Sequence, residues 1–390
     1  MPSKTFKLFE PLKVGNATLQ HRIVLAPLTR YKADEAHVPF LPLVSDYYAQ
    51  RANKPGTLLI TEATFIAARA GGYQHIPGIW SPAQIKAWKS VTDAVHAKGS
   101  FIFMQLWALG RAAEQQQLQS EDPSFAYVSA SDVPLAGHGG PPRPLTVPEI
   151  KEYVDLYAQA AKNAIEAGFD GVEVHSAFKV RSGHNLTNIL FPIGANGYLL
   201  DQFLQDVSNR RTDEYGGSVA NRARFTLEVA DAVVAAVGAD RTSVRFSPWS
   251  PFQGMGMADP LPTFSYVISQ LAARHPGLAY LHLVEPRIDG NTTMDEPSSA
   301  HESNDPLRAL WAPRPLIRAG GFTRDGAIKA AESGDLVAFG RLYISNPDLP
   351  ARLEREIPLN SYDRSTFYLI GENTPRGYTD HAFATATVGA

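Results

Sequence analysis

The sequence contains no cysteine among its 390 residues. Disulfide bonds, thiolate metal sites and a cysteine nucleophile are therefore excluded together. Also missing is any apolar run close to the roughly 20 residues that a membrane-spanning helix needs. Residues 1–5 lead into the chain without an apolar signal region. We therefore expect a cytoplasmic protein rather than a secreted or membrane-inserted one.

A large excess of charge of either sign is missing too. The formal net charge is -3, from 36 Lys and Arg against 39 Asp and Glu. This balance gives no electrostatic reason to expect nucleic acid or a membrane as a partner. The hydrophobic fraction of 44% is sufficient for a large buried core. No break in composition divides residues 1–390, so we expect one domain, as a monomer or a homodimer.

Short apolar segments recur along the chain with helical patterns between them. Near-continuous apolar runs are typical of strands buried on both faces, as in a parallel sheet wrapped by helices. The segments are Arg22–Pro27, Leu58–Ala63, Phe101–Leu106, Gly171–His175, Thr242–Ser247, Ala279–Val284, Pro315–Ala319 and Asp335–Gly340. Eight strand–helix repeats predict an α/β fold, the (β/α)₈ TIM barrel with long βα loops.

The intervening helices have recognisable ends. Ser81 is a candidate N-cap with Pro82 at the first helical position, and Thr146 is placed in the same way before a second helix. A doubly wound open sheet is the main alternative to a barrel. That fold normally has a Gly-x-Gly-x-x-Gly turn after its first strand, and none is present.

Residues at the carboxyl ends of barrel strands carry the chemistry of this fold. No lysine ends a strand, which argues against an aldolase that forms a Schiff base. No histidine pair has metal-ligand spacing, and a site built from His175, His282 and Glu62 would have to be forced, so we expect no metal. The strand ends instead offer hydrogen-bond donors and glycines, which suit a planar polar cofactor with a phosphate.

Seven motifs at these positions resemble the old yellow enzyme family, which has many fungal members. They occur in the family's order from about Phe6 to about Phe383. The motifs are residues 26–30 (APLTR), 71–73 (GGY), 105–107 (QLW), 196–203 (NGYLLDQF), 210–218 (RRTDEYGGS), 318–322 (RAGGF) and 340–347 (GRLYISNP). Each motif alone is weak evidence, whereas all seven in order make the resemblance specific.

The resemblance implies bound FMN, with NADPH as the reductant and NADH as the other possibility. Thr29 would hydrogen-bond the flavin O4, Gln105 would hold its pyrimidine edge, and Arg245 would lie beside N1 and O2. A fixed guanidinium there stabilises the negative charge that reduction adds. The remaining implied cofactor-binding residues are Pro27, Leu28, Ala63 and His175, with Gly320, Gly321, Gly340 and Arg341 around the phosphate.

The resemblance also implies reduction of the C=C bond of an α,β-unsaturated carbonyl compound, a small-molecule enone or enal. His175 and Asn196 would donate hydrogen bonds to the substrate carbonyl oxygen, as an oxyanion hole does. Tyr198 would protonate the α-carbon, because a phenol with an ordinary pKa of about 10 can quench an enolate. Residues expected to shape the substrate pocket are Trp107, Phe252 and Tyr368.

One departure from the family pattern lies inside the catalytic motif. The family reads His-x-x-Asn-x-Tyr, but here residues 178–195 separate His175-Ser176-Ala177 from Asn196. Two explanations remain open. The segment can be a translated intron, because its 18 codons can be written with splice-donor, branch-point and acceptor signals in phase. It can also be a lid loop over the substrate site, since long barrel loops are often functional.

Two other functions remain open. One is a flavin barrel that isomerises or cyclises an intermediate of a fungal alkaloid pathway, although Tyr198 favours reduction. The other is a catalytically impaired family member that binds a ligand or partner.

We expect the deletion of residues 178–195 to raise the rate of 2-cyclohexenone reduction by on the order of 100-fold. A shift of about 1 Å in catalytic donors costs roughly that factor. An 18-residue loop costs only a few kcal/mol to close, so both chains should fold. Steady-state assays of the two chains test this, and equal rates would contradict it. A transcript that always retains the 54 nucleotides would exclude the intron.

Overall fold

The computed structural model describes residues 6–138, 140–176, 197–249, 252–289, 292–293 and 302–384. The segment 178–195 and Asn196 lie outside the described residues. For Phe252 the structure describes the backbone alone.

Parallel strands form a closed barrel in which each of the eight predicted segments supplies one strand. Around the barrel they run β3 (Ile23–Leu25), β4 (Leu58–Ile60), β6 (Phe101–Trp107), β9 (Gly171–Ser176), β10 (Thr242–Phe246), β11 (Tyr280–Val284), β14 (Leu316–Ala319) and β15 (Leu336–Phe339). The pairing of β15 with β3 closes the ring. The (β/α)₈ barrel predicted from the sequence is therefore confirmed.

The first two predicted segments extend two or three residues beyond the ends of the strands they contain. Strand β3 ends at Leu25 and strand β4 at Ile60, so residues 26–30 and 61–63 continue beyond the paired region. Both stretches therefore lie over the carboxyl-end mouth of the barrel. Strand β5 (Thr64–Phe65) then pairs with the far end of β6.

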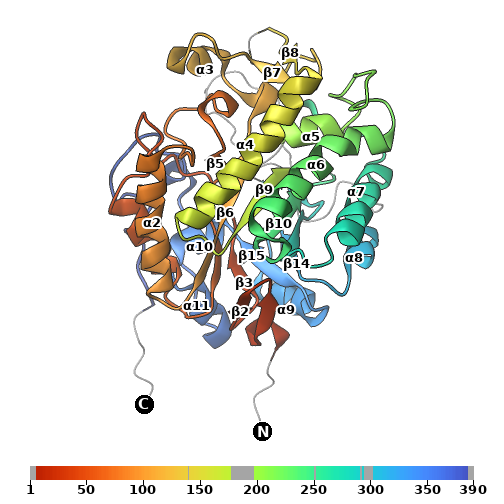
Figure 1. The fold of residues 1–390 in the computed structure, drawn as a ribbon. Helices are drawn as coiled ribbons and strands as arrows, with labels where there is room; N and C mark the ends of the chain where they lie inside the picture. Colours follow the sequence, from red (N-terminus) through yellow and green to blue (C-terminus); the bar gives the residue numbers. More distant parts are fainter. Residues whose placement is uncertain are drawn as a thin grey trace, which may run out of the picture.

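Helices surround the barrel as its outer layer (Figure 1). Those between or after the barrel strands are α1 (Leu43–Arg51), α2 (Pro82–His96), α4 (Val147–Glu166), α6 (Val219–Val237), α7 (Leu261–Arg274), α8 (Asp305–Trp311), α9 (Arg324–Glu332), α10 (Arg341–Ser345) and α11 (Leu349–Arg355). Helices α2, α4, α6 and α9 pack directly on barrel strands. In α2, for example, Trp88, Val91 and Val95 are fully buried at helical spacing.

Short elements cover the two ends of the barrel. Figure 1 places α3 (Gln115–Glu121), β7 (Val128–Ser129) and β8 (Arg143–Pro144) above the carboxyl ends of the strands. The antiparallel hairpin β1 (Leu12–Val14) and β2 (Ala17–Leu19) lies at the opposite end. Helix α5 (Leu199–Leu204) follows strand β9 at the carboxyl end, and β12 (Ile288–Asp289) pairs with β13 (Thr292–Thr293).

Both predicted N-caps start helices. The Ser81 side chain accepts a hydrogen bond from the Gln84 backbone N–H at 3.3 Å, and the Gln84 side chain accepts one from Ser81. Thr146 and Glu149 form the same reciprocal arrangement at the start of α4. These bonds satisfy N–H groups that a helix start would otherwise leave unpaired.

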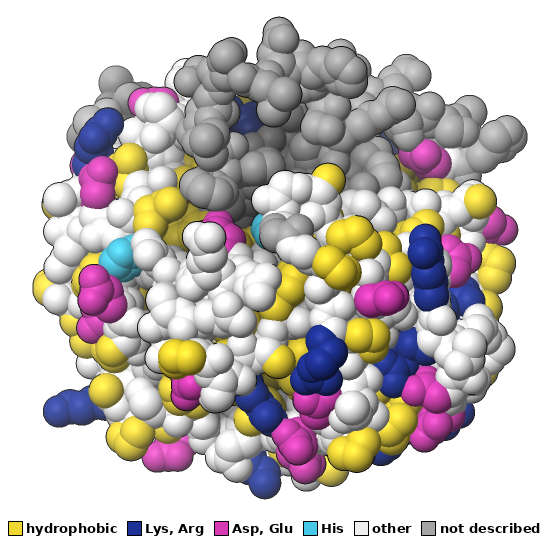
Figure 2. Space-filling view, turned by 90° about the horizontal axis from the view of Figure 1, so that it is seen from above, with side chains coloured by type: hydrophobic (Ala, Val, Ile, Leu, Met, Phe, Trp, Pro, Cys, Tyr) yellow, Lys and Arg dark blue, Asp and Glu magenta, His cyan; other side chains and the backbone are white. Residues whose placement is uncertain are grey.

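The described part of the chain has no helix that is both long and apolar enough to cross a membrane. The face over the carboxyl ends of the strands carries acidic and basic side chains interspersed (Figure 2).

We expect Ser81→Ala to lower the free energy of unfolding by about 1 kcal/mol, because alanine cannot accept the hydrogen bond from Gln84. Ser90→Ala is the matched control, since Ser90 is exposed on the same helix. Urea denaturation of both variants tests this. A loss as large in the control would show that the cap is not the cause.

Candidate active site

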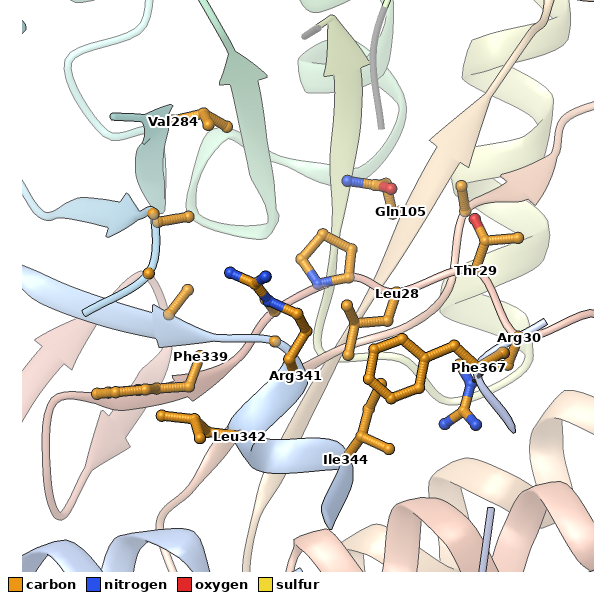
Figure 3. Close-up of a pocket in the computed structure, with 18 of the residues that line it drawn as sticks. Leu28, Thr29, Arg30, Gln105, Val284, Phe339, Arg341, Leu342, Ile344 and Phe367 are labelled. Atoms are coloured by element: carbon orange, nitrogen blue, oxygen red, sulfur yellow. Dashed lines mark hydrogen bonds between the residues drawn. The ribbon is translucent and has the colours of Figure 1, made fainter. Parts of the chain in front are cut away.

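A cavity of about 480 Å³ opens at the carboxyl ends of the barrel strands. Every barrel strand, or the residues directly after it, contributes to its lining. This volume lies within the range of small-molecule and cofactor sites. Figure 3 shows Leu28, Thr29, Gln105 and Arg341 arranged around a common space, although they come from three different strand ends.

Nearly all of the residues singled out in the sequence line this one cavity. They are Pro27, Leu28, Thr29, Ala63, Gln105, Trp107, His175, Tyr198, Arg245, Gly320, Gly321, Gly340, Arg341 and Tyr368. The exceptions are Asn196, which is outside the described residues, and Phe252, whose side chain is not described.

Arg245 brings a buried positive charge to the wall of the cavity. It lies on β10, opposite His175 of β9 and His282 of β11, and is 5% exposed. Its Nε and Nη1 atoms have no hydrogen-bond partner within the described part of the chain. Buried donors on a cation are costly when unpaired. The arrangement therefore fits a ligand that brings acceptor atoms or negative charge to this position.

His175 is a neutral donor beside that cation. Burial, and then the nearby charge of Arg245, lower the pKa of His175 well below its usual value. Its Nδ1 atom has no hydrogen-bond partner in the described ranges. A neutral imidazole carries one N–H donor and one acceptor nitrogen. It can therefore hydrogen-bond an oxygen in the cavity without adding a second full charge.

Tyr198 stands against His175 and Trp107. Its ring meets the Trp107 ring edge-on with centroids 4.6 Å apart, and the His175 ring with centroids 5.2 Å apart. Burial raises the pKa of Tyr198 well above its usual value, so the phenol keeps its proton. A phenol held in this way can donate a proton to a strongly basic carbon.

Hydrogen bonds from the Gln202 side chain hold the turn that carries Tyr198. Gly197 has a φ of +79°, which L side chains rarely adopt. Gln202 Nε2 donates to the carbonyl oxygens of Gly197 at 2.8 Å and Leu109 at 2.9 Å. Gln202 Oε1 in turn accepts from the Ser129 hydroxyl at 2.8 Å. The phenol of Tyr198 is thus placed by a rigid network, which suits a catalytic group.

Glycines line the opposite side of the cavity. Gly320 and Gly321 follow β14 with φ angles of 150° and 61°, and Gly340 follows β15. The Nε atom of Arg287 donates to the Gly320 carbonyl oxygen at 2.6 Å, which helps to fix this turn. Backbone at such glycines can approach a ligand closely, and the nearby Arg341 side chain adds positive charge. These are the features that a phosphate group requires.

Sequence reasoning missed the way in which Arg30 attaches the C-terminal segment to the cavity wall. Arg30 is 1% exposed and donates to the carbonyl oxygens of Phe367 at 3.0 Å and Gly377 at 2.6 Å. In Figure 3 its guanidinium points away from Gln105. Nothing in the local sequence identifies partners 337 and 347 residues away.

Glu62 and His282 were considered above, with His175, as possible metal ligands. In the structure both form hydrogen bonds within the protein. Glu62 Oε2 accepts from the backbone N–H groups of Arg30 at 2.9 Å and Tyr31 at 3.1 Å. Burial raises the pKa of Glu62 to about 7. His282 Nδ1 is 2.8 Å from Glu173 Oε2, deep in the barrel. Glu173 was also missed, although its place in a fully buried strand two residues before His175 was a usable signal.

Comparison with known proteins gives matches over nearly the whole chain. The model of the NADH:flavin oxidoreductase / NADH oxidase family matches residues 7–179 and 189–360. The interruption falls inside the segment 178–195.

Three of the curated relatives come from fungi. A chanoclavine-I aldehyde reductase of Penicillium roqueforti is 52% identical over 383 residues, which cover 97% of this chain and 96% of the relative. An NADP-dependent oxidoreductase of Aspergillus flavus is 46% identical, with 98% and 97% covered. A protein of Epichloe festucae var. lolii described as a probable inactive reductase is 45% identical, with 97% and 96% covered.

A solved structure has the same fold. The old yellow enzyme from Pichia sp. AKU4542 superposes with a TM-score of 0.83 at 38% identity, covering 97% of this chain and 94% of that one.

We expect Asp201→Asn to weaken the pH dependence of stability. Asp201 lies in α5, unexposed, and burial raises the pKa of its carboxyl group to about 7. An unfolded Asp ionises near pH 4, so folding favours the protonated form, and this contribution is lost as pH rises from about 4 to 7. Between pH 4.5 and 7.5 the variant should lose less stability than the parent, by on the order of 1–3 kcal/mol.

Chemical denaturation at the two pH values measures this difference. Asp206→Asn is the control, because Asp206 is exposed nearby. An Asp201→Asn protein whose stability changes with pH as steeply as that of the parent would contradict the assignment.

Proposed function

The chain belongs to the old yellow enzyme family of NADH:flavin oxidoreductases, and from that membership we propose that it uses FMN to reduce the C=C bond of α,β-unsaturated aldehydes and ketones. The observation that carries the proposal is the pair of buried donors on Arg245 that have no partner among the described residues, beside neutral His175 and in a cavity that glycine turns also line. We further propose that residues 1–390 form one FMN-binding domain in which 178–195 is an insertion.

The residues present fit FMN. The cation of Arg245 suits the edge of the isoalloxazine ring that becomes negatively charged on reduction. Thr29 and Gln105 supply polar side chains for the remaining polar edge, and Gly321 and Arg341 suit the phosphate. The other residues proposed to contact FMN are Pro27, Leu28, Ala63, His175, Gly320 and Gly340. The chemistry that FMN supplies when bound is hydride transfer from a reduced nicotinamide to an activated alkene.

The remaining steps fall to side chains of this chain. His175, together with Asn196, donates hydrogen bonds to the carbonyl oxygen of the substrate and stabilises the charge that develops there. Tyr198 gives its proton to the α-carbon. Trp107, Tyr368 and Phe252 shape the pocket and keep water from the reacting carbon.

The names of two relatives support the proposed substrate class and the proposed reductant. An aldehyde reductase at 52% identity supports an unsaturated aldehyde as one substrate class. An NADP-dependent relative supports NADPH as the reductant.

A second candidate is a family member with little or no reductase activity, or one that isomerises or cyclises its substrate. The probable inactive reductase at 45% identity favours it, and so does the interruption before Asn196. The presence of Tyr198 in the cavity favours reduction.

The visible spectrum of the purified protein distinguishes these functions. For an ene-reductase, FMN should stay bound through gel filtration, NADPH should bleach it anaerobically, and 2-cyclohexenone should restore the colour. Bleaching without recovery would support the impaired or isomerising protein. A protein that stays colourless after addition of FMN would contradict the flavin assignment.

We expect Tyr198→Phe to slow flavin reoxidation by 2-cyclohexenone by about 100-fold or more, because it removes the proton donor. Reduction of the flavin by NADPH should change less than about twofold, since that step needs no proton from Tyr198. Stopped-flow absorbance separates the two half-reactions.

Tyr157→Phe is the matched control for loss of a buried phenol. Tyr157 is fully buried in α4 and does not line the cavity. Equal effects of the two substitutions on reoxidation would remove Tyr198 from the proton-donor role.

A further inference from the structure

Three polar side chains form a buried chain directly behind the cavity. Gln105 Nε2 donates to Glu173 Oε1 at 2.7 Å, and Glu173 Oε2 lies 2.8 Å from His282 Nδ1. Glu173 and His282 are completely buried. Gln105 lines the cavity, whereas the other two do not. The proposed function uses Gln105 and leaves Glu173 and His282 without a role.

The barrel topology brings these groups together. Glu173 on β9 is in register with Gln105 on β6 and with Ser243 on β10, and His282 on β11 is in register with Arg245 on β10. Inward-facing side chains of successive parallel strands form layers in such barrels. Glu173 thus lies between Gln105, which lines the cavity, and His282, which does not.

Glu173 carries the negative charge of this layer. Burial alone would raise the pKa of Glu173, but His282, Arg245 and Gln105 together outweigh it and lower the pKa. Burial lowers the pKa of His282, so the imidazole is neutral and its Nδ1–H donates to the carboxylate. Of Gln105, Glu173, His282 and Arg245, only Glu173 is an anion and only Arg245 is a cation.

A carboxylate can only accept hydrogen bonds, and this fixes the Gln105 amide. The Nε2 group must face Glu173, so Oε1 is held as an acceptor on the opposite edge of the amide group. A neutral partner would tolerate both orientations of the amide, because an amide or protonated acid can donate as well as accept. The flavin pyrimidine edge has one N–H donor between two carbonyl oxygens. An amide whose Oε1 faces that N–H can accept from it, whereas a flipped amide would set its own N–H donors against it.

We propose that Glu173 is a positioning residue that locks the Gln105 amide in one orientation for the pyrimidine edge of the flavin and places a negative charge behind that edge. This inference rests on the proposed FMN binding. Two consequences follow that differ in kind. The locked amide strengthens FMN binding, whereas the charge disfavours the reduced, anionic flavin and so lowers the midpoint potential.

The test is Glu173→Gln, with FMN affinity and the midpoint potential of bound FMN as readouts. We expect the dissociation constant for oxidised FMN to rise about tenfold and the potential to become more positive. A loss of packing alone would weaken binding without raising the potential. His21→Gln is the control, because His21 is a fully buried polar group at the opposite end of the barrel. It should change neither readout.

Two further variants separate the amide from the charge. Glu173→Asp keeps the charge but draws the carboxylate back from Gln105, so it should weaken FMN binding without raising the potential. In a Gln105→Ala background, Glu173→Gln should no longer weaken binding, while its effect on the potential persists.

The outcomes distinguish this inference from the function on which it rests. If the parent protein retains FMN and Glu173→Gln matches it in both readouts, the role of Glu173 is refuted and the flavin assignment stands. If Glu173→Gln weakens FMN binding as strongly in the Gln105→Ala background as in the parent protein, the coupling between the two residues is refuted as well. A parent protein that does not bind FMN would overturn both.

Discussion

The site depends on a positive charge placed where a folded protein rarely tolerates one. Arg245 is nearly inaccessible and leaves two donor atoms unpaired among the described residues. A barrel core built from apolar strands gives no reason to bury a guanidinium there. The carboxylate of Glu173 offsets the charge from one side, and the cavity lies on the other. Burying this charge costs folding energy, and such costs are common at functional sites.

The rest of the site can be understood as what that charge requires. His175 stays neutral because burial, and then the nearby charge of Arg245, lower its pKa well below the usual value. The Tyr198 phenol keeps its proton because burial disfavours a phenolate. The amide of Gln105 is held by the same carboxylate that balances the guanidinium. The protonation states of His175 and Tyr198 therefore follow mainly from burial, and the charge of Arg245 adds to the effect at His175.

The sequence was sufficient for the barrel and for most of the cavity. Strands buried on both faces leave near-continuous apolar runs, and the caps at Ser81 and Thr146 use local hydrogen bonds that a short window reveals. Motif residues at strand ends converge because parallel strands in a barrel all point to the same mouth. The attachment of Phe367 through Arg30 could not be predicted, because it joins segments more than 300 residues apart. Glu173 was overlooked for another reason: a carboxylate within an apolar run signals a buried polar group, but no local partner in the sequence indicates its purpose.

The bonds between Arg30 and residues 367 and 377, together with the pairing of β15 with β3, have a consequence for biosynthesis. The first barrel strand and one wall of the cavity are completed by residues that are translated more than 300 positions later. A nascent chain on the ribosome therefore holds an open, incomplete ring with its polar groups in water. A ligand that needs the closed cavity can therefore bind only after residues 367 and 377 have left the ribosome and met Arg30.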